Sequence, residues 1–399
     1  MHSSSVEGRR LVSFLGLRRN IVLLLATLVI IGTGEELWMR FLPKYLEALG
    51  TPVFLIGLFD GIKTLLGALY AYPGGVIADR WGIRKALIAF TAATIAGYLI
   101  LLLLPNPAGV LLGMFLFLAW SFLSLPATFS LVGSSLPPEQ YSMGIGVQSL
   151  VKRLPILVGP VAGGLLIDRL GIFDGVRAGV VLSILFAGAA LAAQASLQDA
   201  RGAIARPARG GVFKVLADFP PELKRLLFSD ILIRFCERIP AAWIVIYAMD
   251  HVGVSASAFG ALISIEMITA MACYIPASHL ADRYGKEPFV IATFVFFSLF
   301  PLTLAFAGGF PVLCLAFAIR GLKEFGEPAR KALIIGYSPP ESRGQSIGAY
   351  YLVRDTVVSL GALAGAALWS LGAQVNLWSA FAMGVAGIFI YTKYGRARL

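Results

Sequence analysis

The sequence predicts an all-α integral membrane protein with twelve transmembrane helices in two pseudo-symmetric six-helix bundles. Three observations predict this fold: an apolar composition, twelve apolar segments of membrane-spanning length, and an internal repeat. Of the 399 residues, 58% are hydrophobic and 14% are charged, and the mean hydropathy is +0.81. Soluble domains are about 45–50% apolar and about 25% charged. The composition therefore excludes a cytosolic enzyme, a disordered chain and a secreted disulfide-rich scaffold.

The apolar segments indicate helices rather than strands. Runs such as 21–31 and 96–104 are continuously apolar, whereas the strands of a membrane β-barrel alternate apolar and polar residues. A helix satisfies its backbone hydrogen bonds within one segment, as a lipid-exposed span requires.

Each predicted helix is an apolar segment of about 20 residues bounded by Gly, Pro or charged residues. The first segment follows basic residues but has no small-residue cleavage site, so we expect it to be retained. The first six segments are 19–48, 53–73, 83–104, 109–134, 142–168 and 176–197, and the last six are 223–250, 256–279, 287–306, 309–336, 343–370 and 373–394. The predicted domains are an N-terminal bundle at 1–197, a cytoplasmic linker rich in Arg, Gly and Pro at 198–222, and a C-terminal bundle at 223–399.

The net charge of +11 indicates membrane topology. Basic residues gather before the first segment, after the second, in the linker and at the C-terminal end, as cytoplasmic loops do. With twelve spans, both termini are expected in the cytoplasm, in the cell (inner or plasma) membrane. Since no basic patch is interleaved with aromatic residues, we expect no nucleic-acid partner.

Cysteine and histidine provide no sign of catalysis. Cys236, Cys273 and Cys314 lie in apolar runs without a CxxC motif, and the three histidines are far apart in sequence. We therefore expect reduced structural cysteines, no bound metal and no enzyme active site. No cofactor is expected beyond a proton or ion gradient.

The second half of the chain repeats the first. Six Gly, Pro and charged residues recur 203 positions later, and seven recur 202 positions later. They are Gly50, Gly57, Pro73, Asp79, Arg80 and Gly82 in the first set, and Pro126, Pro137, Pro138, Glu139, Gly146, Gly159 and Gly163 in the second. Such a repeat predicts two bundles with a pocket between them near mid-membrane.

One loop carries a family resemblance. Residues 75–85, GVIADRWGIRK, resemble the loop motif G-x-L-a-D-r-x-G-r-k of the major facilitator superfamily, and 278–287 resemble a weaker copy. Ile83 and Ser278 depart from that motif. The resemblance, which covers nearly the whole chain, implies a secondary transporter that works by alternating access. It also implies a cytoplasmic gate of Asp79, Arg80, Arg84, Asp282 and Arg283, the alternative being surface charges that set topology.

A second motif concerns transport direction. Gly159, Pro160, Gly163 and Gly164 are similar to the G-P-x-x-G-G motif of antiporter branches of that family, which points to export. Small residues at this spacing also allow close helix packing, so both interpretations remain open.

Ionisable groups within spans cost a few kcal/mol, so each is a functional candidate. The repeat relates opposite charges at three places, pairing Glu35 with Arg238, Lys63 with Glu266 and Arg153 with Asp355. The substrate and proton-coupling candidates are Glu35, Glu36, Arg40, Lys63, Arg153, Glu237, Arg238, Glu266, Glu324, Glu327, Arg354 and Asp355.

The tenth segment is unusually polar at 320–331. Arg320 with Glu324, and Lys323 with Glu327, have the spacing of ion pairs one helical turn apart. Pro328 offers a bending point, and Arg330 is expected to extend its charge toward the membrane surface with Lys331. The cluster is expected to line the cavity or the gate, or to form a structural ion network.

Coupling requires a group whose protonation changes during the cycle, and a desolvated carboxylate meets that requirement. Glu35 is the first candidate because its neighbour Glu36 can pair with Arg40. Permanent pairing of Glu35 with Arg238 is the alternative.

These features predict a secondary active transporter of a small organic solute that is charged or amphiphilic. We expect proton coupling, export or antiport, a monomer, and contact with membrane lipid. The alternatives are a lipid or lysolipid transporter of the same fold, or a membrane receptor or assembly protein that does not transport.

Overall fold

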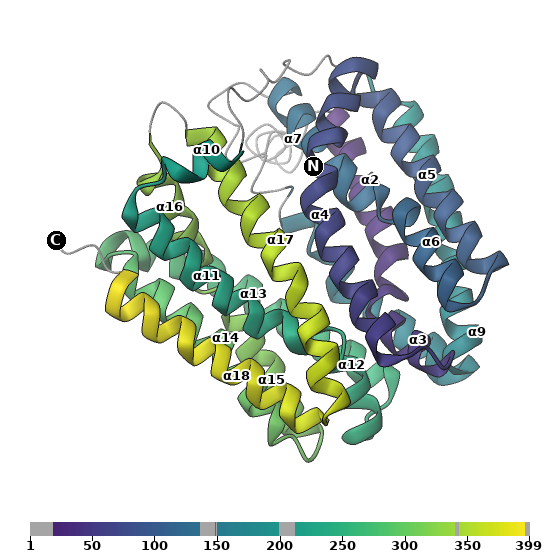
Figure 1. Ribbon diagram of the computed structural model, residues 1–399. Coiled ribbons are helices and arrows are strands. Elements are labelled where there is room, and N and C mark those ends of the chain that lie inside the picture. The colour runs from purple at the N-terminus through teal and green to yellow at the C-terminus, as the bar shows by residue number, and fades with distance from the viewer. Residues whose placement is uncertain (1–18, 136–147, 149, 199–211, 340–342, 396–399) are drawn as a thin grey trace, which may run out of the picture. The chain divides into compact units, whose positions relative to one another are not determined.

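The computed structural model describes residues 19–135, 148, 150–198, 212–339 and 343–395. Every regular element in this part of the chain is a helix (Figure 1). Nine of the described helices are long and apolar enough to cross a membrane. The all-α membrane fold is therefore confirmed, while the count of twelve spans stays a prediction.

The described helices of the first half follow the predicted segments. Gly171, with φ 80° and ψ 169°, interrupts α9 between the fifth and sixth segments. The helices are α2 (Arg19–Glu36), the 3₁₀ turn η1 (Met39–Phe41), α3 (Leu42–Ala48), α4 (Val53–Trp81), α5 (Ile83–Leu103), α6 (Pro107–Phe117), α7 (Ala119–Ser135) and α9 (Leu154–Ala195).

The helices of the second half start after the linker. They are α10 (Val212–Ala217), α11 (Pro221–Ala241), α12 (Ile244–Ile246), the π-helix η3 (Tyr247–His251), α13 (Ala256–Tyr284), α14 (Glu287–Ala305), α15 (Phe310–Leu322), α16 (Glu327–Tyr337), α17 (Arg343–Ser370), α18 (Ala373–Ile390) and the π-helix η5 (Tyr391–Gly395).

The described residues form two compact units. The first unit comprises the described residues of 1–42 and 69–206, and the second comprises those of 43–68 and 207–399. In the first unit α2 packs on α9, and α5 packs on α6 and α7. In the second unit α11 packs on α17 and α18. Residues 43–68 pack with the second unit rather than with their neighbours in sequence.

Glycines in the left-handed region show the internal repeat in the backbone. The six described residues with positive φ are glycines, which have no Cβ to clash in that region. They form three pairs at the repeat shifts of 203, 203 and 201 residues: Gly50 with Gly253, Gly82 with Gly285, and Gly171 with Gly372.

Close packing sets the register of the first helix in each unit. A Cβ built on Gly163 would lie 1.7 Å from the carbonyl oxygen of Leu37, and one on Gly365 would lie 2.2 Å from that of Ile239. Both pairs correspond at a shift of 202. Further along the chain, Gly50 and Gly253 correspond at a shift of 203, so the second half has one extra residue between Ile239 and Gly253. The π-helix η3 lies in this stretch, and its wider turn accommodates the extra residue.

This register corrects one sequence correspondence. At a shift of 202, Glu36 corresponds to Arg238, and Gly159 and Gly361 face these two residues in the same way. Glu35 therefore corresponds to Glu237, an acid of the same sign, and not to Arg238 as the sequence predicts.

Candidate functional site

The second unit contains a chain of ion pairs in which acids and bases alternate. Five acids and five bases on α11, α13, α15, α16 and α17 and at the end of α15 take part. In order they are Asp355, Arg354, Asp230, Arg330, Glu327, Arg234, Glu237, Lys323, Glu266 and Arg320, called here the ion chain. Its formal charges cancel, which is how buried charges are tolerated.

Asp230 is the most enclosed acid of the ion chain, with 1% of its side chain exposed. It pairs with Arg330, whose side chain is 2% exposed, and accepts a hydrogen bond from Arg354 Nη1 at 3.4 Å. The hydroxyl of Tyr350 donates to the same Asp230 oxygen at 3.0 Å. Three helices are thus joined at one buried carboxylate.

Arg330 corrects a sequence expectation. Its guanidinium does not extend to the membrane surface, because Asp230 and Glu327 hold it inside the unit. The Arg330 Nε donates to Glu327 Oε2 at 2.6 Å. Its partner Asp230, an acid inside the seventh predicted span, is not among the site residues predicted from the sequence.

The middle of the ion chain lies between α11 and the end of α15. Arg234 donates to Glu327 at 2.6 Å and to Glu237 at 2.9 Å. Lys323 Nζ donates to the other oxygen of Glu237 at 2.8 Å and lies 3.3 Å from Glu266. Glu237 is therefore held between two cations.

The tenth predicted span is a broken helix. α15 ends at Leu322, α16 begins at Glu327, and Pro328 lies in the first turn of α16. The break takes the predicted pairs out of helical register, so Arg320 pairs with Glu266 of α13 and Lys323 with Glu237 of α11. Both charges contact other helices rather than residues one turn away.

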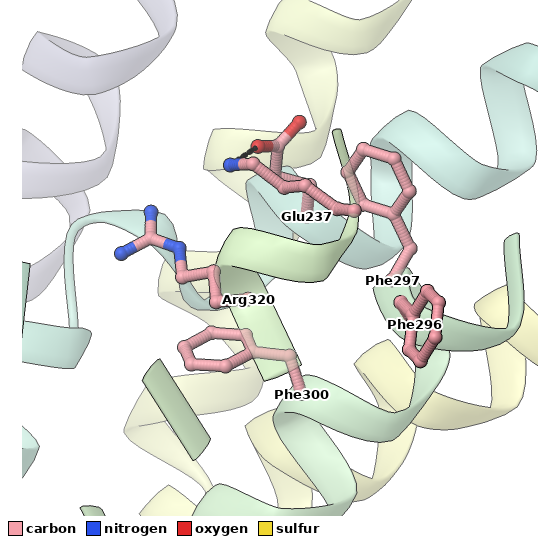
Figure 2. A pocket seen from close by; sticks show the side chains of 6 residues that line it. Glu237, Phe296, Phe297, Phe300 and Arg320 are labelled. Atoms are coloured by element: carbon pink, nitrogen blue, oxygen red, sulfur yellow. Dashed lines mark hydrogen bonds and ion pairs between the residues drawn. The ribbon is translucent and has the colours of Figure 1, made fainter. Parts of the chain in front are cut away.

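A small recess adjoins this end of the ion chain. Three phenylalanines of α14 form one wall, and the guanidinium of Arg320 lies 5.1 Å from the ring centre of Phe300. Figure 2 shows the charged groups beside this aromatic wall. The lining residues are Glu237, Phe296, Phe297, Phe300, Arg320 and Lys323.

Arg238 has a partner that the sequence did not single out. Its Nη1 lies 3.1 Å from Asp60 Oδ2, and Asp60 belongs to the part of α4 that packs with the second unit. Gly57 and Gly61 of the same helix lie against Ala362 and Ser359 of α17, which brings Asp60 to α11.

The first unit holds the predicted acids Glu35 and Glu36. Glu36 pairs with Arg40 at 2.7 Å, as predicted. Glu35 accepts a hydrogen bond from the hydroxyl of Ser121 on α7. The charge of Glu35 also interacts with Lys152, which precedes α9, and with the buried Tyr98 of α5.

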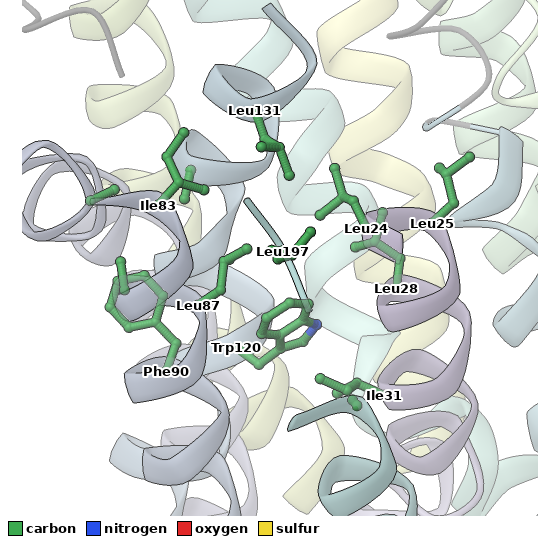
Figure 3. Close-up of a cluster of buried hydrophobic side chains, with 14 of the residues drawn as sticks. Leu24, Leu25, Leu28, Ile31, Ile83, Leu87, Phe90, Trp120, Leu131 and Leu197 are labelled. Atoms are coloured by element: carbon green, nitrogen blue, oxygen red, sulfur yellow. The ribbon is translucent and has the colours of Figure 1, made fainter. Parts of the chain in front are cut away.

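Two buried charges of the ion chain have neutral counterparts among the described residues of the first unit. At the repeat shift of 202, Leu28 replaces Asp230 and Thr128 replaces Arg330. Leu28 belongs to an apolar cluster around Trp120 (Figure 3). Thr128 accepts a hydrogen bond at 3.0 Å from Gln148, which corresponds to Tyr350. The corresponding positions of the two units are thus charged in one and neutral in the other.

The remaining candidates lie at helix ends or on helix faces. Asp79, Arg80 and Arg84 flank the turn at Gly82, and Asp282 and Arg283 precede the turn at Gly285. The guanidinium of Arg283 lies 5.4 Å from the ring centre of Tyr284. Three half-buried charges complete the set: Lys63 on α4, Arg153 before α9, and Glu324 in the break of the tenth span.

Metal chemistry has no support in the part of the chain that the structure describes. No group of three His, Cys, Asp or Glu side chains there is arranged to hold a metal ion. The arrangement instead offers carboxylates, cations and aromatic rings in a membrane helix bundle.

A family model, curated relatives and solved structures all match this chain over most of its length. The model of the Major Facilitator Superfamily matches residues 24–231 and 226–396. The Multidrug resistance protein MdtG of Escherichia fergusonii is 25% identical over 372 residues, which cover 88% of each chain. A nucleoside transporter NupG variant has a TM-score of 0.77 at 14% identity, covering 94% of this chain and 100% of that one. A POT family transporter in complex with 5-aminolevulinic acid has a TM-score of 0.76 at 14% identity, covering 94% and 95%.

Proposed function

Because the chain belongs to the major facilitator superfamily, we propose that it is a proton-driven exporter of small amphiphilic organic solutes. It is a multi-pass membrane transporter and not an enzyme. The name of its MdtG relatives, which refers to multidrug resistance, supports export of organic compounds. The small recess lined by Phe296, Phe297, Phe300, Glu237 and Arg320 has aromatic rings and charges side by side, and this chemistry suits an amphiphilic cargo.

The observation that carries the proton coupling is the setting of Glu35. Its hydrogen bond from Ser121 comes from a neutral hydroxyl, whereas Glu237 is bonded to Lys323 and Arg234. A carboxylate between two cations takes up a proton only when a buried cation loses its partner, which is costly. Glu237 is therefore held ionised, and Glu35, which has a hydroxyl among its partners, is the acid to which we assign the proton-coupling role.

Exchange follows if proton and cargo depend on the same charge. Ionised Glu35 attracts a positive or hydrogen-bond-donating group of the cargo. Protonation removes that attraction and favours release of the cargo. A proton moving down its gradient then drives the solute in the opposite direction, by alternating access.

The gate and the orientation complete the proposal. Asp79, Arg80, Arg84, Asp282 and Arg283 form the cytoplasmic gate, at two turns related by the repeat. Both termini lie on the cytoplasmic side of the cell membrane, in agreement with the basic loops, which are typical of that side. The transporter acts as a monomer in contact with lipid.

Flux in proteoliposomes tests proton coupling. We expect an imposed pH gradient to drive ethidium, fluorescein or a fluorescent lysolipid across the membrane in exchange for protons. Glu35→Gln is expected to abolish gradient-driven flux, because glutamine cannot exchange a proton. Asp174→Asn is the matched control, since Asp174 is an acid whose side chain is 70% exposed.

The outcome also distinguishes the cargo classes. If the lysolipid is the only compound transported, the cargo is a lipid and not a small organic solute. Gradient-driven flux that persists in Glu35→Gln at the native rate would contradict the assignment of Glu35.

A further inference from the structure

Among the described helices, the first, fourth, seventh and tenth predicted spans are interrupted. An interrupted helix leaves backbone groups without their usual helical partners, and lipid offers no replacement. At each interruption a polar side chain from another helix of the same unit contacts the backbone. These side chains are Ser183, Thr94, Asn376 and Thr293, from the sixth, third, twelfth and ninth predicted spans, and each is at most 1% exposed.

Thr94 of α5 occupies the interruption of the fourth span, between α6 and α7. In a continuous helix the Trp120 N–H would donate to the carbonyl oxygen of Leu116, four residues earlier. It donates instead to Thr94 Oγ1 at 3.0 Å, and the same oxygen lies 3.5 Å from the Leu116 carbonyl oxygen. The threonine hydroxyl is therefore inserted between the two helical partners, and such an insertion is a recognised cause of a helix kink.

Thr293 of α14 holds the interruption of the tenth span. The N–H of Gly326, the residue before α16, donates to Thr293 Oγ1. A Cβ on Gly326 would lie 2.0 Å from the carbonyl oxygen of Phe289, so the break lies directly against the backbone of α14. Phe325 stacks on the ring of Phe289, with ring centres 5.2 Å apart. This break is therefore packed and hydrogen-bonded at a defined place.

The other two interruptions are contacted at a carbonyl group. Asn376 of α18 donates from Nδ2 to the carbonyl oxygen of Ile239 at 3.2 Å, near the end of α11. Ser183 of α9 has its Oγ 2.7 Å from the carbonyl oxygen of Gly34, near the end of α2. All four contacts are thus made by a buried side chain of a second helix, which fixes where each span bends.

The two threonine contacts lie next to side chains of the candidate site. The amide held by α5 directly precedes Ser121, whose hydroxyl donates to Glu35. The break held by α14 begins at Lys323, whose Nζ donates to Glu237 at 2.8 Å. A helix turns by about 100° per residue, so a change in bonding at a break would rotate the neighbouring side chain away from its acid.

We propose that Thr94 and Thr293 are positioning residues for transport. Their hydroxyls fix the interruptions of the fourth and tenth spans, and thereby hold Ser121 on Glu35 and Lys323 on Glu237. This inference rests on the proposed function, because it assigns the two threonines to the coupling acid and to the recess that suits the cargo.

Ethidium flux in proteoliposomes tests the role in transport, with rates expressed per folded protein. Thr293→Val keeps the shape of the side chain but removes the hydroxyl. We expect it to raise the KM by about tenfold, because Lys323 and Glu237 line the recess. Thr94→Val is expected to lower kcat instead, because it acts through the coupling acid. The variants Thr94→Ser and Thr293→Ser keep the hydroxyl and should stay near the native values.

Thermal unfolding of the purified full-length protein tests the positioning without a substrate. If Thr293 acts through Lys323, Thr293→Val combined with Lys323→Gln should lower the unfolding temperature by less than the sum of the single losses. Thr303→Val combined with Lys323→Gln is the matched control. Thr303 lies on the same helix, but its hydroxyl donates to the carbonyl oxygen of Leu299 within that helix at 2.8 Å, so additive losses are expected.

Two results would overturn the inference: serine variants that behave like the valine variants, or additive losses for Thr293 and Lys323. The serine and valine comparison decides the question even if Lys323→Gln does not fold. Coupled losses in a native protein without gradient-driven flux would contradict the proposed function and support the positioning of Lys323. Gradient-driven flux that depends on Glu35, together with additive losses, would have the opposite meaning.

Discussion

At the scale of single residues, the environment of a charge decides its role more than its position along a helix does. Arg330 has the sequence signature of a cation near a helix end, yet its side chain is 2% exposed because Asp230 and Glu327 bind it. Glu237 and Glu35 are acids at corresponding positions, yet one is bonded to two cations and the other to a hydroxyl. The same residue type therefore has different partners at corresponding positions of the two units.

The buried ion pair of Arg330 and Asp230 is expected to contribute to the free energy of unfolding. Arg330→Met leaves Asp230 with one fewer cationic partner, so we expect a loss of about 3–5 kcal/mol, the cost of breaking a buried pair. Thermal unfolding in detergent measures it. Arg177→Met is the control, since Arg177 is a cation whose side chain is 46% exposed and whose ion pair contributes about 0–1 kcal/mol. Equal stability of the two variants would show that the ion chain has no stabilising role.

At the scale of elements, the first, fourth, seventh and tenth predicted spans are interrupted. The interruptions fall between α2 and α3, between α6 and α7, between α11 and α12, and between α15 and α16. Discontinuous helices are typical of binding regions in transporters, because unwound backbone is tolerated where it lines a cavity. The Glu35 and Glu237 sites both lie beside such interruptions, which agrees with their candidate roles.

Helix packing supplies the prediction at this scale. A Cβ on Gly163 would lie 1.7 Å from the Leu37 carbonyl oxygen, so Gly163→Ala forces α9 away from the backbone that follows α2. We expect a loss of about 1–3 kcal/mol from overpacking, measured by thermal unfolding. Gly188→Ala on the same helix is the matched control, because a Cβ there meets no atom within 4 Å. If both variants unfold at the same temperature, the glycines of the G-P-x-x-G-G motif are not needed for packing.

At the scale of the whole molecule, the two units do not divide where the predicted linker alone would divide them. Residues 43–68 pack with the second unit through Gly57 and Gly61 against α17. Two ion pairs reinforce this packing, Asp60 with Arg238 and Lys44 with Asp250. A segment of the first half of the chain is thereby held on helices of the second half.

A double-mutant cycle measures this attachment. Asp60→Asn and Arg238→Gln are each expected to lower the stability, and the double variant is expected to lose less than their sum by about 0.5–3 kcal/mol, as for residues in contact. Asp60→Asn combined with Arg177→Gln is the control, with additive losses. Additivity in the Asp60 and Arg238 cycle would mean that the pair contributes no coupling in the protein under the conditions of the measurement.

The sequence by itself determined the class of the protein. Membrane spans can be recognised in the sequence because lipid requires continuous apolar segments. The internal repeat and the family motif at 75–85 can be recognised because a repeat preserves its Gly and Pro residues. The pair of Glu36 with Arg40 was also predictable, since both lie within one turn of each other. These predictions need no knowledge of which helices are neighbours.

Only the tertiary structure decided which charges meet. The partners Asp230 and Arg330 are 100 residues apart, and Lys323 and Glu237 are 86 apart, so no local spacing relates them. The π-helix at Tyr247–His251 adds one residue to the second repeat, so the shift before it is 202 rather than 203. The counterpart of Glu35 is therefore Glu237 and not Arg238. Pairing of buried charges depends on distances between helices, and those distances are set by the packing of the whole unit.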